Sequence, residues 1–423
     1  MAHLEYIDYS PSTVTVEKGA VERTASMRKA LHSRLPQIIW LDGRPWREAN
    51  LWALHRASQR EVNIKTVISQ FSSLVYYANW LELSNSNWWD FPARKDQRCL
   101  IMFRGTLIKE RDSGSLSPST ATKRMRDVIS FYKWLKATKL LVTYWPMWNE
   151  KHATIVINNK YGFERTMTVS TTDLSIKYRP PGGEKLEEGL LPVSSADRDN
   201  ILRFASEYAS TELYLMLTLG FFTGMRIGTL CDLRLETLLM ATPDPACHDL
   251  LKITIGPGAT PKVATKHGVT GQIWITKFHR DSIIEYFYSP RRLLREAKAA
   301  PQNKSLIFLT RYGKPYVKSA GANSSAINVE MFNLRNKAAA KKIKYMEGFY
   351  FHRSRCTFAT ELAKILIPTA GAINALAIIK DALLHRDEAT TLKYIKFVEK
   401  SPAKAAYANE FTQLFLSVQN NQK

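Results

Sequence analysis

Apolar residues recur at helical spacing through the first third of the chain. Residues 65–83 carry one apolar stripe typical of a helix with a buried face, formed by Val67, Phe71, Leu74, Val75, Ala78 and Leu81. A similar stripe in residues 120–138 follows Ser117, a good helix cap, and Pro118, a residue favoured at the first helical position. We therefore expect residues 62–140 to form a small helical domain.

The pattern changes after residue 140. Residues 141–189 contain Pro-Pro-Gly-Gly, a Lys/Glu cluster and short β-branched runs in place of helical spacing, so we expect a linker with a small hairpin. Helical patterns resume in residues 190–400, where the strand-like segments LLKITIG and GQIWIT flank a loop. The predicted fold class is mainly α with a small β-sheet (α+β), in a chain long enough for about two or three domains.

Local signals place some element boundaries in this second region. Ser194 or Ser195 caps a helix, and the pair Thr223-Gly224 separates two more. We expect residues 279–298 to form one helix. Residues 401–423 show an amphipathic helical pattern, with Phe411, Leu414, Phe415 and Val418 on one side.

The chain is strongly basic. Its 60 Lys and Arg residues against 38 Asp and Glu give a formal net charge of +22, which favours a polyanion such as nucleic acid as the partner. No stretch approaches the roughly 18 uninterrupted apolar residues of a membrane span. The N-terminus lacks a secretory signal. We therefore expect a cytoplasmic protein that binds nucleic acid and has no membrane partner.

Basic residues also lie on the predicted helix of residues 120–138, opposite its apolar stripe. Lys123, Arg124 and Arg126 belong to this face, which is either simply solvated or in contact with DNA phosphates. Residues 1–61 are mixed and basic, with a predicted helix in residues 45–58. They form an N-terminal extension that either contacts DNA or packs on the rest of the chain.

The cysteines do not indicate a metal site. The chain has 4 of them, scattered without a CxxC pair, and reduced, mostly buried thiols are the expected state. Cys247 beside His248 falls short of the four ligands that a structural zinc ion needs. We expect no metal and no cofactor.

A set of residues in the second region suits phosphate chemistry. The planar guanidinium groups of Arg226 and Arg355 can each donate two parallel hydrogen bonds to a phosphodiester. Tyr394 can act as a nucleophile whose covalent phosphotyrosine product conserves the energy of the broken bond. His352 lies one helical turn from Arg355, and His385 precedes a Thr-Thr pair. Each residue alone is unremarkable, but their order and spacing favour one anion site.

These residues lie in motifs that resemble those of the tyrosine recombinase, or phage integrase, family. The family's catalytic domain carries TGxR, a hairpin lysine, HxxR, an LLGH-like motif and TTxxY. The corresponding segments here are TGMR, HRSR, ALLH and TTLKY, at residues 223–226, 352–355, 382–385 and 390–394. The resemblance covers residues 190–400, and residues 62–140 resemble the family's SAM-like core-binding domain.

The resemblance implies a role for each residue. Arg226 and Arg355 would clamp the scissile phosphate, and Tyr394 would form a 3′-phosphotyrosyl link. His352 would act as general base, and His385 would donate a hydrogen bond to the phosphate.

The 5′-hydroxyl leaving group needs a general acid, which the family supplies with a hairpin lysine. We favour Lys266, because it lies nearest the turn ahead of the strand GQIWIT, and keep Lys262 as its rival. Three positions depart from the family pattern. Thr229 stands where the family has an acidic residue, Leu384 where it has glycine, and Cys356 follows the second arginine.

The resemblance also implies partners. It predicts a C-shaped clamp of two domains around duplex DNA, with inverted half-sites bound by a dimer and a tetramer in the synapse. Accessory DNA-bending or recombinase proteins are further candidates. Residues 401–423 would pack either on their own domain or on a neighbouring protomer.

The length of the N-terminal extension favours integration or excision of a mobile element. A type IB topoisomerase or a telomere resolvase would use the same chemistry, and a catalytically silent DNA-binding protein would retain the fold. These alternatives stay open at the level of sequence.

Overall fold

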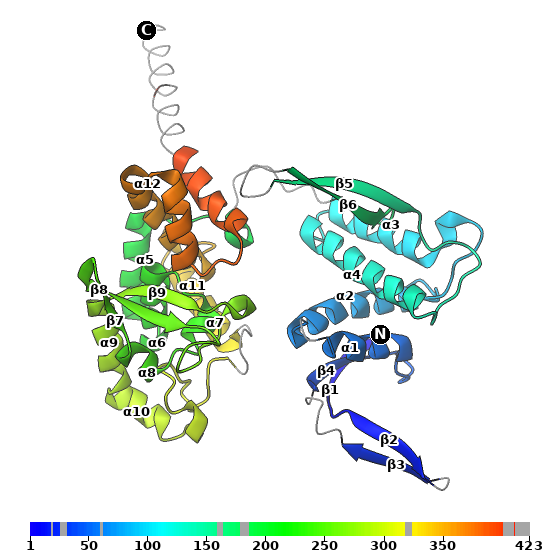
Figure 1. The fold of residues 1–423 in the computed structure, drawn as a ribbon, viewed down its shortest axis with the longest axis horizontal. Helices are drawn as coiled ribbons and strands as arrows, with labels where there is room; N and C mark the ends of the chain where they lie inside the picture. The colour runs from blue at the N-terminus through cyan, green and yellow to red at the C-terminus, as the bar shows by residue number, and fades with distance from the viewer. Residues whose placement is uncertain are drawn as a thin grey trace. The chain divides into compact units, whose positions relative to one another are not determined.

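In this computed structural model the chain divides into two compact units, Met1–Gly182 and Gly183–Lys423 (Figure 1). The structure describes residues 1–17, 20–25, 32–59, 62–158, 164–177, 186–317, 324–400 and 410. The amphipathic helix predicted for residues 401–423 lies outside the described residues, apart from Glu410.

The helical part of the first unit follows the predicted pattern. Ser117 accepts a hydrogen bond from the backbone N–H of Thr120, and Pro118 lies in the first turn. Most of the predicted stripe of α2 is buried, from Val67 to Leu81, and this helix packs against α4. The helices are α1 (Arg47–Ala57), α2 (Ile64–Leu83), α3 (Cys99–Asp112) and α4 (Pro118–Ala137).

The N-terminal residues share this core. Leu35 and Ile38 of β4 and Trp52 of α1 are buried in the same apolar cluster as α2, α3 and α4. Residues 1–61, expected as an extension, therefore pack on the helices through β4 and α1. The strands pair as two antiparallel ribbons: β1 (His3–Tyr9) with β4 (His32–Ile39), and β2 (Ser12–Glu17) with β3 (Ala20–Ala25).

The hairpin predicted between the two regions is present. β5 (Glu150–Asn158) pairs antiparallel with β6 (Glu164–Thr172) and belongs to the first unit. Figure 1 shows it as a long two-stranded ribbon.

The second unit is mainly helical, as predicted, around an apolar cluster that includes Met216, Leu219, Ile253 and Phe308. Ser194 caps α5, and α6 ends at Thr223 before Gly224. Its first helices are α5 (Ser195–Tyr208), α6 (Thr211–Thr223), α7 (Ile227–Leu230) and α8 (Leu235–Leu239). Those that follow are α9 (Lys277–Phe287), α10 (Pro290–Glu296), α11 (Ser325–Ala340) and α12 (His352–Ala382), and residues 388–400 are also helical.

The two predicted strands pair within a three-stranded antiparallel sheet of order β7-β8-β9 in the described part of this unit. Ile253 of β8 lies opposite Ile273 of β9. Their loop contains the short turn η3 (Lys266–Gly268). The strands are β7 (Thr242–Asp244), which the sequence did not indicate, β8 (Cys247–Ile255) and β9 (Gly271–Thr276).

The single helix predicted for residues 279–298 is wrong. The chain forms α9 and α10, which are separated at Tyr288 and Ser289. Pro290 has no N–H to continue the hydrogen-bond ladder, and Ser289 instead caps α10 by accepting from the backbone N–H of Arg292.

By length and composition alone α12 is long and apolar enough to cross a membrane. Core helices of soluble proteins also have this property. The helical conformation of α12 is interrupted at Gly371, where φ is +76°. The helix packs against α6. The first turn of α12 brings His352 and Arg355 to the site described next.

Candidate active site

The side chains that the sequence brings to attention meet around one carboxylate, that of Glu187 in η2 (Glu187–Gly189). Oε1 of Glu187 accepts a hydrogen bond from Nη2 of Arg226 at 2.6 Å. Oε2 accepts one from Nε of Arg355 at 3.0 Å. The two guanidinium groups therefore hold different oxygens of the same anion.

The two imidazoles and the phenol approach the second of these oxygens. Nε2 of His385 lies 3.2 Å from Oε2 of Glu187, and Oη of Tyr394 lies 3.3 Å from it. Nε2 of His352 is 3.9 Å away from the same atom. One carboxylate thus collects all five groups that the motifs single out.

Arg355 is fixed by the backbone around it. Its Nη1 donates to the carbonyl of Gly224 at 2.6 Å, and its Nη2 donates to the carbonyl of Leu383 at 2.8 Å. The residue is 2% exposed. Arg226 follows Gly224 by two residues and occupies the cap position before α7. The end of α6, the start of α7 and the end of α12 therefore determine where both cations lie.

His385 is held in one orientation by Thr391. Nδ1 of His385 lies 2.9 Å from Oγ1 of Thr391, while Nε2 faces the Glu187 carboxylate, which can only accept. Burial lowers the pKa of His385, and the hydrogen bond to Glu187 opposes this shift only in part. The histidine is therefore neutral at neutral pH, with its proton on Nε2, the nitrogen that faces the anion.

Tyr394 lies in the helical residues 388–400 and is fully buried. Burial raises the pKa of its phenol well above the usual range, and the nearby Cys356 and Glu187 raise it further. The Oη atom also lies 3.8 Å from Sγ of Cys356. In this state the tyrosine is protonated and donates to Glu187.

The Glu187 carboxylate is ionised. Burial opposes its negative charge, but the hydrogen bond from His385 and the charges of Arg355 and Arg226 outweigh burial and lower its pKa well below the usual range. The site therefore contains an ionised carboxylate between two arginines.

A cavity of about 570 Å³ adjoins this cluster. Arg226, Lys266 and His352 line it, together with Tyr350 and Phe351. Lys262 instead lines a different pocket with Arg234 and Glu236. Of the two lysines considered as general acid, Lys266 is the one that shares a cavity with the candidate site.

The basic residues predicted on α4 differ in their environments. Nζ of Lys123 donates to the buried carboxylate of Asp127 at 2.7 Å, and the guanidinium of Arg124 stacks over the ring of Tyr76 at 3.5 Å from its centroid. Arg126 is exposed. Among these three, Arg126 has the side chain most open to a partner.

Glu187 is not among the site residues predicted from the sequence, because it falls in the predicted linker of residues 141–189. Its contacts join it to Arg355 and Tyr394, which lie 168 and 207 residues further along the chain. One signal was available, because Thr229 stands where the family has an acidic residue. That departure suggests a compensating carboxylate without saying where it lies.

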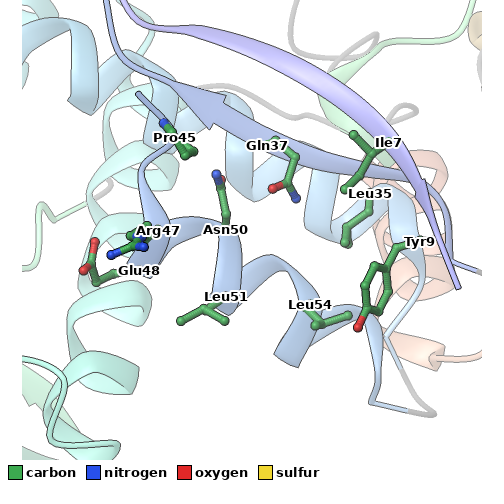
Figure 2. A pocket seen from close by; sticks show the side chains of 10 residues that line it. All are labelled: Ile7, Tyr9, Leu35, Gln37, Pro45, Arg47, Glu48, Asn50, Leu51 and Leu54. Carbon is green, nitrogen blue, oxygen red and sulfur yellow. The ribbon is translucent and has the colours of Figure 1, made fainter. Parts of the chain in front are cut away.

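A pocket of about 520 Å³ in the first unit lies between the strands β1 and β4 and the helix α1 (Figure 2). It is lined mainly by apolar side chains, with Arg47 and Glu48 at one end. Tyr9 lies at the opposite end of the pocket from Arg47 and Glu48, so the lining does not bring these three side chains together. Among the described residues, no group of three His, Cys, Asp or Glu side chains is placed to hold a metal ion.

Comparison with known proteins gives structural neighbours only, since no protein-family model and no curated protein matches the sequence. The Tn1549 transposon integrase, solved with circular intermediate DNA, is 14% identical with a TM-score of 0.49, and the match covers 82% of this chain and 94% of that one. A lambda integrase dimer bound to a COC′ core site is 12% identical with a TM-score of 0.46, covering 84% and 94%.

Both neighbours are tyrosine recombinases. A lambda integrase tetramer bound to a Holliday junction is also similar, at 14% identity, a TM-score of 0.45 and coverage of 84% and 76%. Identities and TM-scores this low assign no activity to this chain. Its function has to be inferred from its own residues.

Proposed function

We propose that this protein is a tyrosine recombinase, which cleaves and rejoins duplex DNA through a 3′-phosphotyrosyl intermediate. The observation that carries the proposal is the convergence of Arg226, Arg355, His385, His352 and Tyr394 on a single anion. A phosphodiester carries the same single negative charge as the carboxylate that these groups now hold. The net charge of +22 supports a DNA partner.

The proposed reaction assigns one role to each group. Oη of Tyr394 attacks the scissile phosphorus and forms a phosphorus–oxygen bond, while the bond to the 5′-oxygen breaks. His352 takes the proton from the phenol, and Lys266 gives a proton to the leaving 5′-oxygen. Rejoining is the reverse, with a 5′-hydroxyl attacking the phosphotyrosine.

The remaining groups stabilise the transition state. Arg226 and Arg355 would each donate to a nonbridging oxygen, where negative charge develops on the pentacoordinate phosphorus. Neutral His385 would add a hydrogen bond from Nε2, the nitrogen that already faces an anion. In this scheme His352 accepts the proton of the phenol and Lys266 donates the proton to the 5′-oxygen, so both proton transfers use side chains of this chain.

The assembly and biological role extend the same proposal. We infer two domains that close as a C-shaped clamp on duplex DNA, a dimer on inverted half-sites and a tetramer in the synapse. Integration or excision of a mobile element is the role we favour. A type IB topoisomerase or a telomere resolvase is the competing enzyme class.

Covalent capture from a random DNA pool tests the chemistry whatever the target sequence is. The full-length protein is incubated with a pool of nicked random duplexes, and protein–DNA adducts that survive denaturant are isolated and sequenced. We expect adducts on a restricted set of sequences, with none formed by Tyr394→Phe. The exposed Tyr288→Phe is the matched control, because it removes a hydroxyl elsewhere in the same unit.

The outcomes separate the alternatives. Adducts from Tyr394→Phe would reject the nucleophile assignment. Relaxation of supercoiled plasmid with no sequence preference would favour a topoisomerase. DNA binding without any adduct would favour a silent DNA-binding protein.

A further inference from the structure

Glu187 occupies the place that the scissile phosphate needs. Its two oxygens accept hydrogen bonds from Arg226 and Arg355, and one of them also receives His385 and Tyr394. We infer that Glu187 is an internal stand-in for the scissile phosphate, an autoinhibitory carboxylate that DNA must displace before Tyr394 can react. The inference concerns regulation of the same site and rests on the proposed function.

The donors of Arg355 show why the carboxylate and a phosphate exclude each other. Its Nη1 and Nη2 atoms donate to the backbone carbonyls of Gly224 and Leu383. Its Nε atom faces the site and already donates to Glu187 at 3.0 Å. A phosphate oxygen can meet this nitrogen only where Oε2 of Glu187 now lies.

Glu187 connects a residue of the cavity wall to the buried nucleophile. Arg226 and His352 line the cavity, whereas Arg355, His385 and Tyr394 are buried, with exposures of 2%, 6% and 0%. Glu187 contacts Arg226 on the cavity side and Tyr394 on the buried side. A phosphate that enters from the cavity therefore competes with Glu187 for the guanidinium of Arg226.

Protonation does not release the carboxylate at neutral pH. Burial favours the protonated form, but His385, Arg355 and Arg226 together hold the pKa of Glu187 well below its usual value. The same shift makes Glu187 a poor base for the Tyr394 phenol. A competing anion is the remaining way to release it, and exchange for a phosphodiester leaves the charge of the site unchanged.

The surrounding turn allows the side chain to leave without unfolding. Leu186 is buried in the same apolar cluster as Cys356 and Tyr394, and its backbone N–H donates to the carbonyl of Leu190. These contacts anchor η2 on the second unit. Rotation about the side-chain bonds of Glu187 is enough to move its carboxylate, because each staggered rotamer places the oxygens differently.

A phosphate would also gain a contact that the carboxylate lacks. Nε of Arg226 is buried and has no hydrogen-bond partner within the described part of the chain. A phosphodiester spreads its oxygens over a tetrahedron, so it offers this donor an acceptor that the planar carboxylate does not. In the absence of DNA the site thus binds the Glu187 carboxylate, and it binds a phosphodiester in preference to that carboxylate.

The test uses inorganic phosphate as the first probe and the full-length protein throughout. Phosphate affinity is measured from the shift of the thermal midpoint with phosphate concentration, at constant ionic strength set with chloride. We expect Glu187→Ala to bind phosphate at least roughly tenfold more tightly than the wild type, because the competing internal anion is gone. Glu187→Gln, which keeps the shape and loses the charge, provides a second variant if the alanine variant folds poorly.

The controls separate this effect from a general change of charge. Glu285→Ala removes one exposed carboxylate from α9 and should leave phosphate affinity unchanged. Arg226→Ala combined with Glu187→Ala should abolish the gain, because the new phosphate site requires that guanidinium.

Adduct formation on captured DNA sequences is the second readout, and we expect the Glu187 variants to react on the order of tenfold faster. Equal phosphate affinity in wild type and both Glu187 variants, or slower adduct formation in both variants, would overturn the inference. Tighter phosphate binding with no adduct from any protein would support the internal stand-in and reject the proposed recombinase chemistry. The two proposals can therefore fail separately.

Discussion

The backbone carbonyl of Gly224 accepts a hydrogen bond from Nη1 of Arg355 at 2.6 Å. Gly224 has a φ of +66°, and a Cβ atom added there would lie 2.5 Å from Cδ1 of Phe358 and 2.8 Å from Cδ2 of Leu383. This glycine therefore ends α6, turns the chain toward Arg226 and lets α12 approach closely. The relative placement of the two arginines depends on it.

Gly224→Ala is expected to lower the free energy of unfolding by about 2–4 kcal/mol. The substitution combines the strain of a left-handed residue with overpacking against two side chains. Urea denaturation of the full chain measures the change. Gly348→Ala is the matched control, since Gly348 has a φ of +60° with nothing within 4 Å of an added Cβ, and should cost only about 1–2 kcal/mol. Equal losses in the two variants would contradict the close approach of α12.

Lys123 is predicted to support the fold rather than bind DNA. The carboxylate of Asp127 is buried and accepts hydrogen bonds from Nζ of Lys123 and Oγ of Ser73, each at 2.7 Å. Lys123→Met leaves a buried charge with fewer partners, so it should lower the free energy of unfolding by about 1–3 kcal/mol. DNA affinity, measured by fluorescence anisotropy on the folded protein, should change little.

Arg126→Ala provides the comparison on the same helix. Arg126 is exposed, so its loss should alter the free energy of unfolding by less than about 0.5 kcal/mol. If this face of α4 contacts phosphates, the variant binds DNA more weakly. The slope of the logarithm of the DNA association constant against the logarithm of the salt concentration then decreases in magnitude by about 1. Weaker DNA binding by Lys123→Met together with unchanged DNA binding by Arg126→Ala would instead assign the DNA contact to Lys123.

The helices of the first unit could be predicted because their signals are local. Ser117 and Pro118 specify the start of α4 within two adjacent residues, and the stripe of α2 repeats within one helix. The N-terminal strands could not, because their pairing is long-range. His3 lies opposite Ile39, and no local spacing records that contact.

The candidate site shows the same division. Motif spacing singles out Arg226, Arg355 and Tyr394, but the carboxylate that joins them comes from a segment that looks like a linker. Departures from a family pattern were informative only in part. Leu384 stands where the family has glycine, and it adopts a φ of +49°, a left-handed conformation that glycine adopts most easily.

His385 is expected to make stability depend on pH in a defined window. Burial lowers its pKa from the ordinary value of 6.5, so between the two values the unfolded chain binds a proton that the folded chain excludes. The stabilisation is complete above pH 6.5 and is lost as the pH falls through the folded pKa. When the pH is lowered from about 7.5 to about 5.5, the free energy of unfolding should therefore fall by about 1 kcal/mol less in His385→Gln than in the wild type.

Urea denaturation at the two pH values measures this difference. His267 and His279 also have lowered pKa values, caused first by burial, but both remain in the variant and cancel in the comparison. His248→Gln, which removes an exposed histidine on β8, is the control. An identical pH dependence in wild type and His385→Gln would show that His385 is not excluded from protonation by the fold.

The general acid is predicted to be Lys266, because it shares the cavity of Arg226 and His352 whereas Lys262 lines another pocket. Lys266→Ala should slow cleavage of an ordinary nicked duplex by on the order of 10²–10⁴-fold, the usual contribution of a positioned proton donor. Lys262→Ala should cleave at nearly the wild-type rate.

A substrate with a bridging 5′-phosphorothiolate separates proton donation from other roles of the lysine. A thiolate leaves without a proton, so this substrate should restore the cleavage rate of Lys266→Ala to nearly that of the wild type. Single-turnover adduct formation on both substrates measures the rescue. Rescue of a slow Lys262→Ala variant instead would assign the acid to Lys262, because only the true donor becomes dispensable when its proton is no longer needed. A slow Lys266→Ala variant that the thiolate fails to rescue would mean that Lys266 acts on phosphate binding, where its charge is needed whatever group leaves.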